Sequence, residues 1–357
     1  MTKTTAASST TPILIVFLAC TVSGVVPATA QGQGKTRLFD PEPMSGVSAN
    51  DSSEPNVETI SAEAINAADF TGQALPDGQS PITAKIQIFL DRGGVSPGVI
   101  DGYAGENVDK AIRAFEEING FPVDGIMDKD VWQALQAHGG EAVSAYQITV
   151  EDVSGIVPPL PEDYKELAKL DWLGYESAAE LLAERFHMDI EFLQALNPGV
   201  DFAETGTTIL AANPGTDAET QIARIVADKS RERLLVYDAT GRLVLSYPVT
   251  IGSGDTPSPT GTHEVLGVAT DPTYSYRPDE NFQQGDNDEQ LTLPPGPNGP
   301  VGSVWIDLSE PTYGIHGTPD PALIGKTASH GCVRLTNWDA NELAALVTNG
   351  TPVEFVD

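Results

Sequence analysis

Cysteine and positive charge are both scarce in this chain of 357 residues. The only cysteines are Cys20 and Cys332, so a chain that loses Cys20 during export cannot form an intrachain disulfide. Lys and Arg number 19 against 51 Asp and Glu, which gives a formal net charge of −32. Nucleic-acid binding needs a basic surface, so the composition excludes nucleic acid as a partner. The acidity instead favours solubility.

Long hydrophobic runs are also missing. The first 30 residues hold no acid and one base, Lys3, followed by the apolar run Ile13–Ala19. This run is too short to span a bilayer comfortably, so we expect no transmembrane anchor in the mature chain. The segment ends in Pro27-Ala28-Thr29-Ala30, an Ala-x-Ala cleavage site. We therefore predict a signal peptide over residues 1–30 and export from the cytoplasm. The alternative is lipidation at Cys20, although Phe17-Leu18-Ala19-Cys20 is a poor lipobox.

Histidine is limited to five residues, and they are scattered without the spacing of zinc ligands. The sequence therefore predicts no metal site. We interpret His187 as a histidine at the edge of a core and His263 as a structural residue at the start of a strand.

Two segments have the composition of connecting regions. Residues 31–80 are rich in small and polar residues and cannot bury enough apolar surface to offset the entropy of ordering, which predicts a disordered tether. Residues 139–168 contain Gly139-Gly140 and Pro158-Pro159-Leu160-Pro161, which predicts a linker.

Residues 81–138 have apolar residues at helical spacing in three stretches. Asp101-Gly102 precedes the second stretch and Asp124-Gly125 precedes the third, which gives a weak internal repeat. A small three-helix bundle follows from this pattern alone. The paired Asp-Gly turns also resemble the three-helix peptidoglycan-binding domain, although Asn107-Val108-Asp109 stands where that family usually has a Thr at the helix start. The resemblance implies binding to peptidoglycan.

Residues 169–215 read as two short amphipathic helices followed by a strand. The second helix ends in Asn197-Pro198-Gly199, and this order resembles a LysM module, a small β-α-α-β glycan binder. The first strand of such a module is poorly formed in this segment. A helical linker domain that packs on its neighbour is the alternative.

From residue 219 to residue 357 the chain is rich in β-prone runs. We predict strands over 223–227, 233–237, 242–249, 263–268, 304–308 and 353–356, with a hairpin turn at 238–241 and a helix near 338–347. Many strands at short spacing predict a mainly β domain of the sandwich or barrel-like kind. Residues 270–300 form a long irregular insertion, of the kind that often walls a substrate site.

One cluster of reactive residue types lies in this domain. Cys332 follows His330-Gly331 directly, and His316-Gly317 lies upstream. A free thiol has a pKa of about 8.5 and needs a neighbouring base to react at neutral pH, and an imidazole can act as that base. Cys332 is therefore a predicted nucleophile. The alternative is an inert buried cysteine.

These residues resemble the signature of the L,D-transpeptidase (YkuD-type) catalytic domain. The matching runs are Tyr313-Gly314-Ile315-His316-Gly317-Thr318 and Ser329-His330-Gly331-Cys332-Val333-Arg334-Leu335, with support from Pro257–Thr262 and Gly299–Gly302. The resemblance implies that His316 takes the proton of Cys332 and returns it to the leaving amine.

The other residues of the signature have predicted roles around the thiol. The backbone N–H groups of Gly331 and Cys332 are candidate oxyanion donors, because glycine lets the chain approach a substrate closely. Arg334 offers a planar cation to a substrate carboxylate or forms a surface salt bridge. His330 either fixes the loop or lines the acceptor side. Ser329 either orients a histidine or closes a turn.

The resemblance implies a periplasmic transferase of peptidoglycan synthesis, with a part in cell-wall biogenesis and cell shape. In that reading Cys332 forms a thioester with a tetrapeptide stem at meso-diaminopimelate, the terminal D-Ala leaves, and the amine of another stem makes a 3→3 cross-link. It also implies acylation by carbapenems, stem peptides and glycan as partners, and no cofactor. The alternatives are water as acceptor (a carboxypeptidase or amidase), a lipoprotein lysine as acceptor, or an inactive wall-binding scaffold.

Overall fold

A computed structural model describes residues 60–252, 257–279, 283–327, 329 and 331–357. The predicted signal peptide and residues 31–59 of the predicted tether lie outside these ranges, as does His330. Every helix within the described ranges is too short or too polar to cross a membrane.

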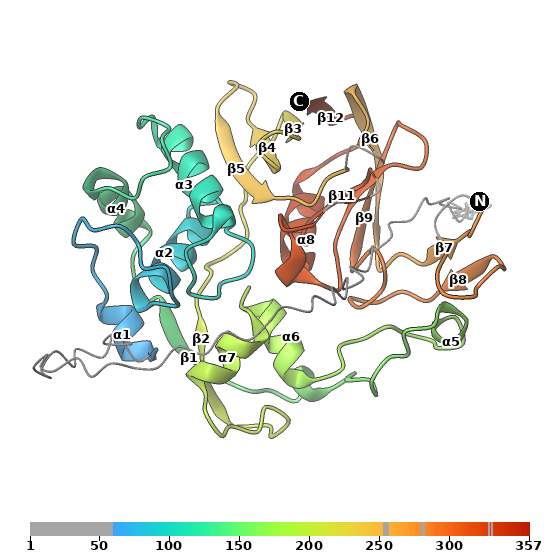
Figure 1. Cartoon of the computed structure of the whole chain (residues 1–357), viewed down its shortest axis with the longest axis horizontal. Coiled ribbons are helices and arrows are strands. Elements are labelled where there is room, and N and C mark those ends of the chain that lie inside the picture. The colour runs from blue at the N-terminus through green and yellow to red at the C-terminus, as the bar shows by residue number, and fades with distance from the viewer. Residues whose placement is uncertain (1–59, 253–256, 280–282, 328, 330) are drawn as a thin grey trace, which may run out of the picture.

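The N-terminal half of the described chain is mainly helical (Figure 1). It contains α1 (Ala62–Ala67), α2 (Pro81–Arg92), α3 (Glu106–Asn119), α4 (Lys129–Leu135), β1 (Val143–Gln147), α5 (Tyr164–Leu167), α6 (Ala178–Arg185), α7 (Ile190–Leu196) and β2 (Thr208–Ala212), with short 3₁₀ turns at Gln136–His138 and Glu151–Val153. Helices α2, α3 and α4 confirm the three-helix prediction. Helix α2 begins where the Ser80 side chain accepts a hydrogen bond from the Thr83 amide, and α3 ends at Gly120 in a left-handed conformation.

Two boundary predictions differ from the structure. Residues 60–80, expected to belong to a disordered tether, include α1, and Ile65 on that helix is fully buried in the core. The Asn66 side chain also accepts hydrogen bonds from the Ala142 and Val143 amides and donates one to the Val143 carbonyl. Residues 139–168, expected to be a linker, include β1. Composition missed both segments because each is ordered by partners far along the chain.

Strand β1 pairs with β2 in an antiparallel register from Val143–Ala212 to Gln147–Thr208. The strand that pairs with the predicted 169–215 unit therefore comes from the predicted linker. Buried residues from Ala62 to Ala212 form one continuous hydrophobic cluster, so the three helices and the β1, α6, α7 and β2 unit share a core. The LysM-like character of residues 169–215 stays a prediction.

The C-terminal half is built on one eight-stranded sheet, in the order β11-β10-β9-β6-β12-β3-β4-β5. Its strands are β3 (Arg224–Asp228), β4 (Arg233–Tyr237), β5 (Leu243–Pro248), β6 (Gly261–Thr270), β9 (Val304–Leu308), β10 (Gly314–His316), β11 (Val333–Arg334) and β12 (Pro352–Val356). All six predicted strands are confirmed, as is the helix, α8 (Asn337–Leu346). A 3₁₀ turn at Pro321–Leu323 precedes the segment that leads to β11.

The mainly β prediction is confirmed, but the strands form one curled sheet in place of a two-sheet sandwich. Strand β6 causes this difference: its first residues pair with β12 and its later ones with β9, with a register shift between Val265 and Gly267. A bulge bends a strand and increases its twist. Because β6 bends there, one core cluster draws on both ends of the sheet and on α8. Strands β7 (Tyr274–Tyr276) and β8 (Leu291–Leu293) form a separate hairpin within the 270–300 insertion.

Polar groups are buried where the two halves meet. Arg233 on β4 is 2% exposed and donates to the Ser96 carbonyl (3.0 Å) and to the Ser246 carbonyl (2.9 Å). The Ser96 hydroxyl donates to Asp339 on α8 (3.0 Å). The His187 ring stacks on Trp338, with ring centroids 5.1 Å apart, and is hydrogen-bonded to Asp91 (2.7 Å). These contacts join the helical half to β4 and to the first turn of α8.

This junction predicts a pH-dependent stability. Burial, and then the charge of Asp91, raise the pKa of Asp339 to about 7. The folded chain therefore holds a proton on Asp339 at pH values where the unfolded chain has lost it. Stability falls as pH rises from about 4 to about 7, by up to about 1.4 kcal/mol per pH unit for this group. Urea unfolding at pH 5, 6, 7 and 8 should show a flatter dependence in Asp339→Asn than in the wild type. The exposed control Asp171→Asn should keep the wild-type slope, and an unchanged slope in Asp339→Asn would contradict the assignment.

Candidate active site

Strands β10 and β11 place the predicted reactive residues beside each other. The two strands are parallel, with Ile315 opposite Val333 and His316 opposite Arg334. Residues opposite each other in a register share a face of the sheet, and side chains alternate along a strand. His316 and Arg334 therefore belong to one face, and Cys332, just before β11, shares a buried cluster with Trp305, whose ring stacks on His316. The structure thus brings together residues that are separated in the sequence.

His316 is held as a neutral base. Its Nδ1 lies 2.7 Å from the Gly317 carbonyl, an acceptor, so Nδ1 carries the proton. The ring is 3% exposed and stacks on Trp305, with centroids 5.4 Å apart and planes 20° from parallel. Burial and the nearby Arg334 cation lower the pKa of His316 to about 3. At neutral pH the imidazole is uncharged and its Nε2 lone pair can accept a proton.

Cys332 is a buried thiol, 3% exposed. Its Sγ lies 3.9 Å from the Thr312 carbonyl. The pKa of Tyr313 is raised, first by burial and then by the charge of the Cys332 sulfur. Gly331 precedes the cysteine with φ of +112°, and a Cβ there would lie 2.5 Å from the Tyr313 ring. Only glycine fits this position, which fixes the path of the chain into Cys332.

Two serine hydroxyls hold the chain before and after the thiol. Ser329 Oγ accepts from the Gly331 amide (3.2 Å) and donates to the Cys332 carbonyl (2.6 Å). Ser258 Oγ accepts from the Gly252 amide (2.9 Å) and donates to the Gly331 carbonyl (2.7 Å). Both serines are buried. These two hydrogen bonds of Ser329 span the turn at Cys332, and its role toward a histidine stays a prediction.

The Ser329 contact also bears on the oxyanion prediction. The Gly331 N–H already donates to Ser329 Oγ, so it is not available to a substrate oxygen in this conformation. The Cys332 N–H stays a predicted donor.

Loss of the Ser329 hydroxyl should loosen this turn. In Ser329→Ala we expect the rate of reaction at Cys332 to fall by up to about 30-fold, because two hydrogen bonds worth about 1 kcal/mol each disappear. Acylation kinetics followed by intact-protein mass spectrometry would measure the change. Ser154→Ala, which removes a hydroxyl from the 3₁₀ turn of the helical half, should keep the wild-type rate. Equal rates for Ser329→Ala and the wild type would show that the turn holds without the hydroxyl.

Sequence reasoning missed several residues that shape the site. Gly314 lies so close to Trp305 that a Cβ would overlap the indole ring, so glycine is required where the tryptophan covers His316. The Asn337 amide fills the space left by the missing side chains of Gly302 and Gly317, and its Oδ1 accepts from the Ser303 amide (3.2 Å). The Gly-rich motifs are the feature of the sequence that could have indicated these contacts, since each glycine marks a close approach of another group.

Arg334 is half-buried, and its backbone exchanges hydrogen bonds with Thr250, at 2.9 and 3.1 Å. Its guanidinium lies close enough to lower the pKa of His316. The predicted role of His330 falls outside the described residues. No group of three histidine, cysteine or carboxylate side chains suited to a metal occurs in the described part of the chain.

The sequence profile of the L,D-transpeptidase catalytic domain (YkuD) matches residues 222–355, which include this site. A relative from Bacillus licheniformis, whose name assigns it to the L,D-transpeptidases as YkuD, is 33% identical over 177 residues, 49% of this chain and 92% of the relative. The chain belongs to the L,D-transpeptidase family. This confirms the resemblance drawn from the His316 and Cys332 motifs.

A second family model matches the helical half of the chain. The peptidoglycan-binding domain profile matches residues 79–135, which hold α2, α3 and α4. A relative from Escherichia coli, named as the L,D-transpeptidase YbiS, is 30% identical over 218 residues, 57% of this chain and 70% of the relative. A solved L,D-transpeptidase structure from Mycobacterium smegmatis aligns with a TM-score of 0.32 at 19% identity, covering 43% of this chain and 64% of that one. The chain therefore combines an L,D-transpeptidase catalytic domain with a peptidoglycan-binding domain.

Proposed function

We propose that this family member is an exported, cysteine-dependent acyltransferase that forms 3→3 cross-links between peptidoglycan stems in the periplasm. The observation that supports the proposal is Trp305, which stacks on the neutral His316 and packs in one buried cluster with Cys332. A thiol beside an unprotonated imidazole is the arrangement that nucleophilic acyl transfer requires. The predicted signal peptide and the peptidoglycan-binding domain support the location and the substrate.

In the first step the Cys332 sulfur attacks the carbonyl that joins diaminopimelate to the terminal D-Ala. His316 Nε2 takes the thiol proton as the sulfur–carbon bond forms. When the carbon–nitrogen bond breaks, the same proton passes to the departing D-Ala amine. The product is a thioester on Cys332, and the imidazole is neutral again. The low pKa of His316 favours return of this proton, because the imidazolium is unstable in its buried site.

In the second step the amine of another stem attacks the thioester carbonyl. His316 accepts a proton from this amine and delivers it to the sulfur as the sulfur–carbon bond breaks. The products are a new amide and the free thiol. Arg334 lies on the same face as His316 and supplies a cation for a carboxylate of a stem.

Purified mature protein incubated with tetrapeptide muropeptides tests this reaction. We expect release of D-Ala and formation of 3→3 dimers, identified by liquid chromatography and mass spectrometry. We also expect a carbapenem to add to the peptide that contains Cys332. Formation of tripeptides without dimers would show that the protein is a carboxypeptidase and not a cross-linking transferase. Intact muropeptides together with an unmodified cysteine would favour an inactive wall-binding scaffold. Fractionation of cells should find the protein in the periplasm.

A further inference from the structure

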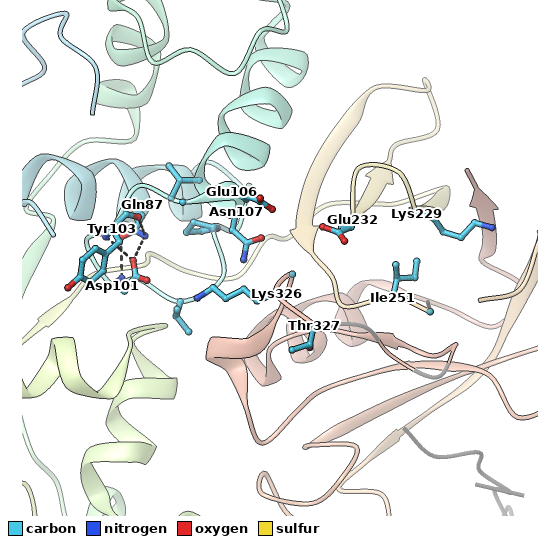
Figure 2. Close-up of a pocket in the computed structure, with 16 residues that line it drawn as sticks. Gln87, Asp101, Tyr103, Glu106, Asn107, Lys229, Glu232, Ile251, Lys326 and Thr327 are labelled. Carbon is cyan, nitrogen blue, oxygen red and sulfur yellow. Dashed lines mark hydrogen bonds between the residues drawn. The ribbon is translucent and has the colours of Figure 1, made fainter. Parts of the chain in front are cut away.

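A cavity of about 740 Å³ lies between the peptidoglycan-binding domain and the catalytic domain (Figure 2). One wall comes from α2, from residues 97–105 and from the start of α3. The other wall comes from Lys229, Glu232, the segment Ile251–Gly252 and the segment Gly325–Thr327. This volume is within the range of ligand pockets and is large enough for part of a short peptide.

The cavity wall is joined to the segment that carries the nucleophile. The Ser329 amide donates to the Ile251 carbonyl (2.9 Å), and Gly252 forms a bridge with Ser329. Ser329 in turn holds the Cys332 carbonyl. A ligand that packs against Ile251 therefore rests on the residues that support the reactive turn.

Most charges that line the cavity are neutralised by protein partners. Two lining carboxylates, Glu232 and Glu106, form ion pairs with Lys110 outside the lining. The Glu106 pair is 3.8 Å long. Lys229 forms an ion pair with Asp357 at 2.5 Å. These contacts leave one cation and one anion of the lining for a ligand.

That cation and anion are Lys326 and Asp101. Figure 2 shows the Lys326 side chain extending across the cavity toward Asp101. Among the described residues, neither side chain forms an ion pair. Asp101 is oriented by hydrogen bonds from the Gln87 side chain (2.8 Å) and the Tyr103 amide (2.9 Å) to its Oδ1. Opposite charges held on facing walls suit a ligand that carries both a carboxylate and an amine or amide.

Asn107 adds an acceptor to the same wall. Its Nδ2 donates to the Ile324 carbonyl (2.9 Å), which links the two domains. Its Oδ1 is buried against Gly325 and has no hydrogen-bond partner among the described residues. A buried unpaired acceptor costs about 1 to 3 kcal/mol, and a ligand donor that displaces the Gly325 segment from Asn107 Oδ1 would recover that cost.

We propose that this cavity is a second binding site for a peptidoglycan stem peptide, separate from the site that holds Cys332. A carboxylate of the stem pairs with Lys326, and its amine or amide N–H groups donate to Asp101 and Asn107. The exposed ring of Tyr103 covers the apolar part of the ligand. The identity of the ligand rests on the proposed function. A glycan without a peptide lacks the charges that this lining selects.

Binding of a soluble tetrapeptide muropeptide to full-length mature Cys332→Ala tests the proposal without turnover. Calorimetry gives the affinity, and hydrogen exchange locates the ligand. We expect protection of residues 97–108 and 323–327. Adding Lys326→Glu should weaken binding at this site by at least tenfold and abolish that protection, because an attraction is replaced by a repulsion. Lys169→Glu makes the same change of charge at an exposed ion pair with Glu166 and should bind as Cys332→Ala does.

Equal affinity and protection with and without Lys326→Glu would overturn the proposal. Equal binding of the disaccharide without its peptide would also overturn it. The readout does not depend on catalysis, so a wild-type protein that fails to transfer acyl groups counts against the proposed reaction alone.

Discussion

Cys332→Ala is expected to lower the rate of acyl transfer by at least about 10⁴-fold, the scale of losses when a catalytic nucleophile is removed. The side chain is buried and small, so alanine fits the same space and the fold should be retained. Release of D-Ala from tetrapeptide muropeptides measures the effect. Circular dichroism and the urea midpoint, both expected to match the wild type, show that the loss is chemical.

Cys332→Ser is the matched control for the sulfur itself. The hydroxyl has nearly the same shape but is a much weaker nucleophile, because its proton is far harder to remove. We expect activity almost as low as that of Cys332→Ala and no stable carbapenem adduct. Retained D-Ala release in either variant would show that another group performs the attack.

His316→Asn is expected to have the second largest effect, a fall of about 10² to 10⁴-fold in the rate of thioester formation. Asparagine can still donate a hydrogen bond to the Gly317 carbonyl, so the variant removes the base while keeping that contact. The residual rate should rise with pH, because a thiolate must then form without help from an imidazole.

The wild type should behave differently over the same pH range. Because the pKa of His316 is lowered to about 3, its base form persists at pH 5, where an ordinary histidine would be mostly protonated. We therefore expect no loss of rate between pH 7 and pH 5 that can be assigned to protonation of His316. A rate in His316→Asn equal to that of the wild type, or a wild-type inflection near pH 6.5 that the variant lacks, would contradict this role.

The parts of this fold that could be predicted are those with strong local patterns. The long β-prone runs became β3 to β6, β9 and β12, and the three periodic stretches became α2, α3 and α4. Strands β10 and β11 have three and two residues, too few for a pattern, and only the family resemblance indicated their importance. Strand β1 was missed because its partner β2 begins at Thr208, far along the chain.

The candidate site also has features that local sequence predicts and features that it does not. Cys332 and His316 could be named from residue type and motif. Three other features depend on three-dimensional contacts. They are the hydrogen bond from the Gly331 amide to Ser329, the stacking of Trp305 on His316, and the hydrogen bond from Ser258 to the Gly331 carbonyl. Motifs predict which residues meet, whereas their hydrogen-bond partners depend on backbone conformation that a single sequence does not display.

The buried contacts between the two halves determine what excision of the catalytic domain would do. A chain shortened to residues 219–357 would expose Arg233 without the Ser96 carbonyl that accepts its hydrogen bond. It would also leave the Asn337 amide without Glu184, to which it donates at 3.0 Å. Asn337 fills the space beside Gly317, the residue whose carbonyl orients His316. The helical half therefore completes the packing of the catalytic domain. The isolated domain would lack contacts that support the position of His316.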